Sequence, residues 1–108
     1  MMRMVFEQKG YTVLEASRGD EAVAICERHA GSIDLLVTDI MMPRMNGRQL
    51  AERLVQARPG MKMLFVSGYN HDTLIGDGLL KADTAFIQKP FRAHDLARKT
   101  REVLSSKT

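Results

Sequence analysis

DLLVTDIMMPRMNG, residues Asp34–Gly47, is the most informative stretch of this 108-residue chain. It is a short apolar run that carries one carboxylate, Asp39, at its end and then breaks at Met42-Pro43 and Asn46-Gly47. An apolar run bounded by turn residues is typical of a buried strand in a parallel sheet. Parallel sheets place their ligands at the carboxyl ends of their strands, so Asp39 is predicted to lie where a ligand or a reaction is located.

Two later segments bring further polar groups to strand ends. LFVSG places Ser67 after the predicted strand Met61–Val66, and FIQKP places Lys89 after the predicted strand Ala85–Gln88. The carboxyl ends of parallel strands meet at one edge, so a carboxylate, a hydroxyl and an ammonium group should converge there. Taken singly, each residue has an ordinary explanation: a turn or capping Asp, a strand-end Ser bonded to nearby backbone, and a solvated Lys. The order and spacing of all three favour a functional site.

These three segments resemble the receiver domain of two-component response regulators, the CheY-like family. The resemblance covers nearly the whole chain, and the AFIQKPF and LFVSGY segments are similar to receivers at the C-terminus of hybrid sensor histidine kinases. The family pattern D-x-x-M-P-x-M-x-G is matched by Asp39, Met42, Pro43, Met45 and Gly47, and its K-P-F is matched by Lys89-Pro90-Phe91.

The resemblance implies phosphorelay signal transduction. Asp39 would accept a phosphoryl group from a histidine kinase or a histidine phosphotransfer protein. Lys89 would pair with the acyl phosphate, Ser67 would bond a phosphoryl oxygen and move on activation, and Gly68 would leave room beside the phosphate. Phe86 stands where the family has an aromatic switch, although a core phenylalanine is the alternative. The domain would be a phosphoacceptor rather than an enzyme, with at most weak self-dephosphorylation.

Two structural details also follow from the resemblance. The Lys89–Pro90 peptide bond is expected to be cis, which is uncommon even before proline. The family binds Mg²⁺ through an acidic pair at the end of its first strand, the acceptor Asp and a backbone carbonyl two residues later. Here Asp39 and the Met41 carbonyl match, but the chain starts after the acidic pair. Mg²⁺ prefers several oxygen ligands, so its binding is expected to be weakened or lost. We call the carboxyl edge of the sheet, where the strands end, the rim. The acids nearest to it in sequence are Glu15, Asp20 and Asp34, and none of them stands in the sequence context of the family's acidic pair.

Strand and helix patterns alternate along the chain without a linker or repeat, which predicts a parallel sheet covered on both faces. We therefore expect one receiver domain over residues 1–108, incomplete at its N-terminus. The resemblance implies a flavodoxin-like, doubly wound, three-layer α/β/α fold that lacks its first, central strand and most of its first helix. Two strands would then have unpaired edges, which are expected to promote self-association. The predicted strands are Tyr11–Ala16, Asp34–Asp39, Met61–Val66 and Ala85–Gln88, and the predicted helices are Asp20–His29, Arg48–Ala57, His71–Leu80 and Ala93–Ser105.

Composition and charge argue against several other classes of protein. The net charge of +3 comes largely from the last predicted helix and the residues beside it, where Arg92, Arg98, Lys99, Arg101 and Lys107 outnumber Asp95 and Glu102. No aromatic residues alternate with these basic ones, so we expect no direct nucleic-acid binding. No apolar stretch approaches the length of a membrane span. The single cysteine, Cys26, excludes an intramolecular disulfide and suits the reducing cytoplasm.

Two other functions stay open. The first is a degenerate receiver that acts as a phosphorylation-independent binding or scaffold module, which the missing acidic pair favours. The second is an aspartyl-phosphate hydrolase of the haloacid dehalogenase type, which also uses a strand-end Asp. That class needs a second Asp two residues later, and Met41 occupies this position.

Overall fold

The computed structural model describes residues 2–16, 19–40, 47–81 and 84–105. Helices and strands alternate through most of this length, as expected. In chain order the elements are α1 (Met2–Gln8), α2 (Gly19–Arg28), β1 (Leu35–Asp39), α3 (Gly47–Ala57), β2 (Lys62–Ser67), α4 (His71–Gly76), β3 (Phe86–Gln88) and α5 (Ala93–Ser105).

The three strands of the described chain form one parallel sheet in the order β1-β2-β3. Leu35 lies opposite Lys62 and Asp39 opposite Val66, while Phe65 lies opposite Phe86. This register brings the carboxyl ends of all three strands to the same edge of the sheet.

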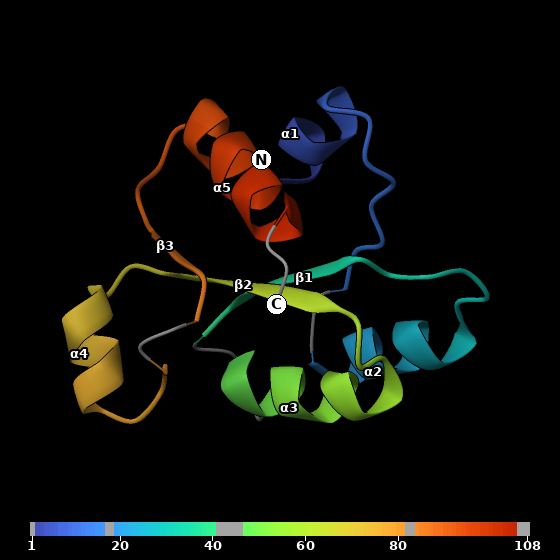
Figure 1. The fold of residues 1–108 in the computed structure, drawn as a ribbon, viewed down its shortest axis with the longest axis horizontal. Helices are drawn as coiled ribbons and strands as arrows, with labels where there is room; N and C mark the ends of the chain where they lie inside the picture. The colour runs from blue at the N-terminus through green and yellow to red at the C-terminus, as the bar shows by residue number, and fades with distance from the viewer. Residues whose placement is uncertain (1, 17–18, 41–46, 82–83, 106–108) are drawn as a thin grey trace.

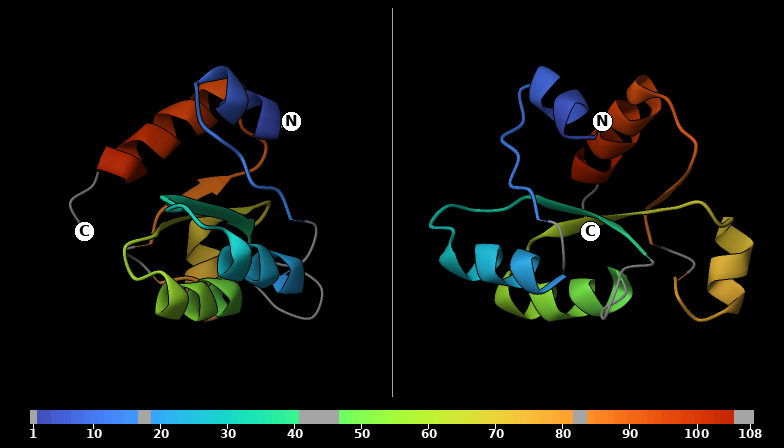
Figure 2. Two further views of the ribbon diagram at one scale, coloured as in Figure 1. Left: turned by 90° about the vertical axis from the view of Figure 1, so that its right-hand side faces the viewer. Right: turned by 180° about the vertical axis from the view of Figure 1, so that it is seen from behind.

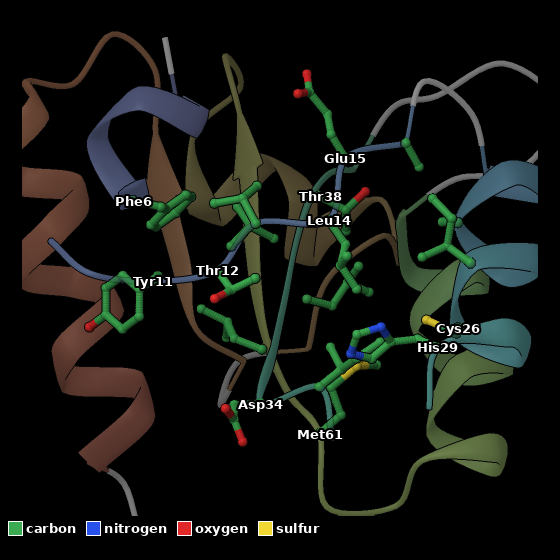
Figure 3. Close-up of a pocket in the computed structure, with 18 of the residues that line it drawn as sticks. Phe6, Tyr11, Thr12, Leu14, Glu15, Cys26, His29, Asp34, Thr38 and Met61 are labelled. Carbon is green, nitrogen blue, oxygen red and sulfur yellow. The ribbon is translucent and has the colours of Figure 1, made fainter. Parts of the chain in front are cut away.

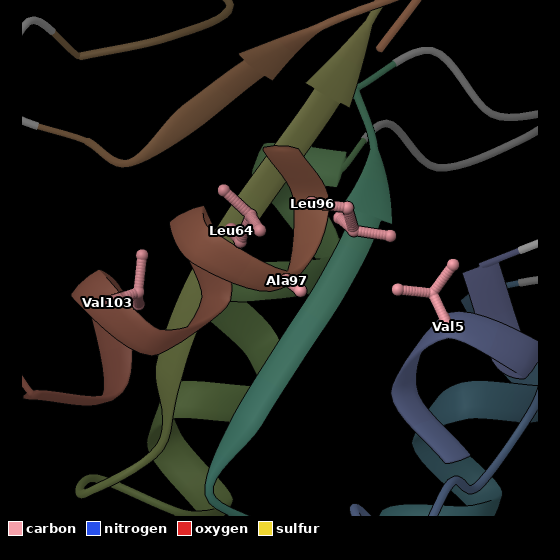
Figure 4. Packing of buried hydrophobic residues seen from close by; sticks show 5 residues of the cluster. All are labelled: Val5, Leu64, Leu96, Ala97 and Val103. Atoms are coloured by element: carbon pink, nitrogen blue, oxygen red, sulfur yellow. The ribbon is translucent and has the colours of Figure 1, made fainter. Parts of the chain in front are cut away.

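Helices cover both faces of the sheet, which gives the expected three layers (Figures 1 and 2). Helices α1 and α5 lie together on one face, α2 and α3 lie on the other, and α4 lies near the β3 side. Figure 4 shows the cluster under α1 and α5, where Val5, Leu64, Leu96, Ala97 and Val103 are buried. The apolar character of the strands on both faces follows from this double coverage.

Successive side chains of β1 pack against opposite helical layers. Leu35 and Val37 pack against the cluster under α1 and α5, whereas Leu36 packs against the clusters under α2 and α3. The single cysteine, Cys26, belongs to the α2–α3 side, where burial raises the pKa of its thiol and the charge of Arg58 lowers it in part. Cys26 is therefore a packing residue, as its apolar neighbours in sequence indicate.

The strand predicted over Tyr11–Ala16 is wrong. The segment is extended but belongs to no sheet, and the Tyr11 N–H donates to the Phe6 carbonyl at 3.1 Å instead. A cavity of about 730 Å³ separates the segment from β1, so its backbone has no strand within hydrogen-bonding reach in the described chain. Extended sequence propensity alone does not make a strand, because a strand needs a paired neighbour.

Helix α4 is shorter than the predicted range His71–Leu80. It begins after Asn70, whose side chain accepts a hydrogen bond from the Thr73 N–H at 2.8 Å. It ends at Gly76, and Gly78 then adopts a left-handed φ of 75° that a continuing helix cannot contain.

Arg58, directly after α3, holds the carboxyl end of α2. Its guanidinium donates to the carbonyls of Cys26 at 2.9 Å, His29 at 2.8 Å and Gly31 at 2.9 Å. The last carbonyls of a helix have no partners within the helix, so Arg58 satisfies the Cys26 carbonyl of α2 together with two carbonyls of the segment that follows the helix.

Replacing Arg58 with Met should therefore lower the free energy of unfolding by roughly 1–3 kcal/mol, because three carbonyls lose a charged donor. Urea denaturation followed by circular dichroism measures the change. Arg53→Met, at an exposed position of α3, is the matched control and should change stability by less than about 0.5 kcal/mol. Equal effects of the two variants would show that Arg58 does not stabilise the end of α2.

Candidate functional site

Asp39 and Lys89 meet at the carboxyl edge of the sheet. Asp39 is the last residue of β1, and Lys89 directly follows β3. The Lys89 Nζ lies 2.8 Å from the Asp39 Oδ1, and the two side chains are 47% and 40% exposed. An ion pair this exposed contributes only about 0–1 kcal/mol to stability. Its position at the rim, open to solvent, is better suited to chemistry than to holding the fold.

Ser67 lies at the end of the middle strand, between the other two. Asp39 is in register with Val66, the residue before Ser67, and the Lys89 N–H donates to the Ser67 carbonyl at 2.8 Å. The Ser67 hydroxyl is buried and accepts a hydrogen bond from the Tyr69 N–H at 3.1 Å. As an acceptor in that bond, the hydroxyl keeps its own proton for another oxygen.

The rim is open beside Ser67. Gly68 is exposed, and a Cβ atom built on it would meet no atom within 4 Å. Tyr69, the next residue, is 60% exposed. The loop after β2 is therefore open to solvent at Gly68 and Tyr69, where the middle strand ends.

Phe86 is half-buried at the start of β3, packed against the cluster that contains Ile40, Leu74 and Leu80. Its ring lies 5.7 Å from the ring of His71, the first residue of α4, at an angle of 36°. The side chain thus contacts both the layer beneath the site and the neighbouring helix. Sequence reasoning did not identify His71 as its partner, and no spacing signal links residues in separate elements.

Gly47 fixes the backbone under Asp39. The Gly47 N–H donates to the Ile40 carbonyl at 2.6 Å, and a Cβ atom at position 47 would collide with the Asp39 carbonyl oxygen and approach the Ile40 Cα to 3.0 Å. Gly47 matches the family motif in the sequence, but the motif does not predict this contact. Only a residue without a side chain lets α3 begin so close to the end of β1.

The described residues do not make a complete magnesium site. Within residues 2–16, 19–40, 47–81 and 84–105, no group of three His, Cys, Asp or Glu side chains could hold a metal ion. Asp39 supplies one carboxylate, and Mg²⁺ usually needs more oxygen ligands than that. The predicted Met41 carbonyl lies outside the described residues.

The other acids that the sequence places near the rim are engaged elsewhere. Glu15 lies at the same end of β1 as Thr38, but its carboxylate is paired with the Arg3 guanidinium at 3.1 Å (Figure 3). Asp34 lies at the opposite end of β1. The Asp20 carboxylate accepts a hydrogen bond from the Glu21 N–H at 3.0 Å, at the start of α2.

The Lys89–Pro90 bond is cis, as expected. None of the helices in the described part of the chain has the length and apolar character that a membrane crossing requires.

Comparison with known proteins agrees with this arrangement. The family described as "Response regulator receiver domain" matches residues 1–101. The sensor kinase CckA of Brucella abortus (strain 2308) is 39% identical over 98 residues, which are 91% of this chain and 10% of that protein. The response regulator receiver protein CpdR of the same organism is 33% identical over 98 residues, covering 91% of this chain and 80% of that protein.

A solved structure shows the same fold. The crystal structure of the receiver domain from the hybrid histidine kinase CckA has a TM-score of 0.78 and 31% identity to this chain. The match covers 96% of this chain and 86% of that one. The matched part thus spans 86% of that receiver domain, but only 10% of the length of the curated sensor kinase.

Proposed function

This chain belongs to the family of response regulator receiver domains, which act in phosphorelay signal transduction, and on that premise we propose that Asp39 is its phosphoacceptor. The donor is a phosphohistidine on a histidine kinase or a histidine phosphotransfer protein. The observation that carries the proposal is the 2.8 Å pair between the Asp39 carboxylate and the Lys89 ammonium group at the open carboxyl edge of the sheet.

The chemistry follows from the charges at this edge. A carboxylate oxygen of Asp39 attacks the phosphorus, the phosphorus–nitrogen bond of the phosphohistidine breaks, and its electron pair stays on the histidine nitrogen. The products are an acyl phosphate on Asp39 and a free histidine. The reaction brings an anionic nucleophile to an anionic phosphoryl group, so a nearby cation lowers the barrier. Lys89 is within contact distance of the nucleophile and supplies that charge.

In this proposal, Ser67 and Phe86 transmit the phosphorylation state of Asp39 to α4. The Ser67 hydroxyl turns from the Tyr69 N–H and donates its proton to a phosphoryl oxygen, in the space left open by Gly68. Movement at Ser67 frees room for Phe86, whose ring moves inward and leaves its contact with His71. Helix α4 thereby reports the state of Asp39.

We expect Mg²⁺ to contribute little at the Asp39 site of this chain. The family generally uses Mg²⁺, which supplies charge neutralisation at the phosphoryl oxygens, but Asp39 is one carboxylate where several oxygen ligands are preferred. We expect the isolated chain to bind Mg²⁺ weakly. The residues that act on the phosphoryl group are then Lys89 and Ser67.

The similarity to CckA supports a position within a hybrid sensor kinase, in the cytoplasm, where a kinase or phosphotransfer partner reaches the rim. A second candidate is a degenerate receiver that binds partners without phosphorylation. The single carboxylate at the rim of the described structure favours this alternative.

Phosphorylation by a small phosphodonor distinguishes the two functions. The chain is incubated with phosphoramidate, with and without Mg²⁺, and its intact mass is measured over time. We expect the mass of one phosphoryl group to be added. The absence of an added phosphoryl group with both the small donor and a phosphorylated histidine phosphotransfer protein would contradict the phosphoacceptor role and favour the scaffold function.

Lys89→Met tests the role of the cation separately from the fold. The variant should accept the phosphoryl group more slowly, on the order of 10²-fold, because the charge beside Asp39 is removed. Its free energy of unfolding should change by less than about 1 kcal/mol, since the pair is largely exposed. Lys62→Met, on β2, is the control, and an equal loss of rate in both variants would contradict the role of Lys89.

A further inference from the structure

Thr38 directly precedes Asp39 on β1, and its side chain takes no part in the mechanism proposed for Asp39 and Lys89. It is buried, at 6% exposed, and its Oγ1 donates a hydrogen bond to the Asp39 carbonyl oxygen at 3.0 Å. We propose that Thr38 is a positioning residue for the phosphoryl transfer, because it fixes the backbone from which the Asp39 carboxylate projects. This inference rests on the proposed role of Asp39 as the phosphoacceptor.

The peptide unit between Asp39 and Ile40 is held on both sides. Its N–H, which belongs to Ile40, donates to the Val66 carbonyl at 3.1 Å. Its carbonyl, which belongs to Asp39, accepts the hydrogen bond from Thr38. A peptide unit is planar, so hydrogen bonds at its two opposite ends fix its orientation. This orientation sets the ψ angle of Asp39 and, with it, the direction in which the Asp39 side chain leaves the strand.

The other neighbours of this peptide unit are also fixed. Gly47 lies so close that a Cβ atom on it would collide with the Asp39 carbonyl oxygen, and its N–H donates to the Ile40 carbonyl at 2.6 Å. The Ile40 side chain is fully buried. Loss of the Thr38 hydroxyl would therefore loosen one side of a single peptide unit, while the strand around it stays paired.

The ion pair with Lys89 does not hold the Asp39 carboxylate in one place. The two side chains are 40% exposed for Asp39 and 47% exposed for Lys89, and a lysine ammonium group sits on a flexible four-carbon chain. Such a cation moves with the carboxylate that it pairs with. Attack on phosphorus requires an oxygen placed in line with the bond that breaks, so a small misplacement lowers the rate. The orientation of the carboxylate must then come from its backbone, where Thr38 acts.

A purely structural role for Thr38 predicts different effects of substitution. Valine keeps the branched shape of threonine and removes the hydroxyl, whereas serine keeps the hydroxyl and removes a methyl group. Packing alone would therefore tolerate valine better than serine, and positioning requires the reverse. Thr100 is the matched control, because it is 1% exposed and its hydroxyl has no hydrogen-bond partner among the described residues.

The kinetics of phosphorylation test the role of Thr38 in the reaction. The unmodified chain, Thr38→Val, Thr38→Ser and Thr100→Val are incubated with increasing concentrations of phosphoramidate, and intact mass gives the initial rates. We expect Thr38→Val to lower the maximal rate on the order of fivefold, the loss of about one neutral hydrogen bond, with an unchanged donor concentration at half-maximal rate. Thr38→Ser should keep most of the rate, and Thr100→Val should match the unmodified chain.

Three-bond NMR couplings of the Asp39 side chain test the positioning without any phosphorylation. The couplings from the backbone nitrogen and carbonyl carbon to Cγ report whether χ1 occupies one staggered rotamer or several. We expect one rotamer in the unmodified chain and in Thr38→Ser. Thr38→Val should show averaged couplings, because the backbone that carries the side chain is no longer fixed on both sides.

The proposal is overturned if Thr38→Val keeps either the rate or the couplings of the unmodified chain. It is also overturned if Thr38→Ser loses as much rate as Thr38→Val. A different result, no phosphorylation of the unmodified chain, would contradict the proposed function of Asp39 instead. The couplings alone would then decide whether Thr38 orients the Asp39 side chain.

Discussion

Asp39→Asn should abolish the addition of a phosphoryl group from phosphoramidate or from a phosphorylated histidine phosphotransfer protein. The amide removes the anionic oxygen that attacks phosphorus. Of the described groups beside it, Lys89 is a cation and Ser67 carries a neutral hydroxyl, so neither replaces the carboxylate. Intact-mass spectrometry of the variant beside the unmodified chain measures the effect. The fold should persist, because the exposed Asp39–Lys89 pair contributes about 1 kcal/mol at most.

Asp34→Asn is the matched control for this prediction. Asp34 precedes the same strand but lies at its amino end, is exposed, and has the same chemistry as Asp39. The control should be phosphorylated at the rate of the unmodified chain. Phosphorylation of Asp39→Asn at that same rate would show that another residue is the acceptor.

Gly47→Ala should destabilise the chain by roughly 2–3 kcal/mol, the largest effect expected from adding a single methyl group here. The added Cβ would collide with the Asp39 carbonyl and press on the Ile40 Cα, and both are backbone atoms that cannot rotate away. Relief requires α3 to move from the end of β1, which also displaces the Asp39 carboxylate. We therefore expect a slower rate of phosphorylation together with the loss of stability.

Gly60→Ala provides the comparison for Gly47. A Cβ atom at position 60 would meet nothing within 4 Å, so stability should change by less than about 0.5 kcal/mol. Urea denaturation of both variants gives the free energies. Equal stability of the two variants would mean that the close approach of α3 to β1 does not exclude a side chain at position 47.

The sequence predicted the elements that are bounded by strong local signals. The last helix is predicted at its observed bounds, Ala93–Ser105, because its apolar residues recur at helical spacing. Turn residues likewise bounded β1 and β2 to within one residue of the prediction. The convergence of Asp39 and Lys89 was also predictable, since the ends of parallel strands share an edge.

The features that the sequence did not predict depend on contacts between residues that are far apart in the chain. Tyr11–Ala16 has the composition of a strand, but the cavity beside β1 deprives it of a paired neighbour. The contact of Phe86 with His71 and the three carbonyls held by Arg58 also join separate elements. The contact of Asp39 with Lys89 is observed, but the roles of Asp39, Lys89, Ser67, Gly68 and Phe86 all stay predictions.

The most direct test of the account locates the phosphoryl group. The phosphorylated chain is reduced with borohydride, which converts an aspartyl phosphate to homoserine, and is then digested with trypsin for peptide sequencing by mass spectrometry. The tryptic peptide from His29 to Arg44 contains both Asp34 and Asp39, so it carries its own internal control. We predict homoserine at position 39 and unmodified aspartate at position 34. Homoserine at any other aspartate, with Asp39 unmodified, would contradict this prediction.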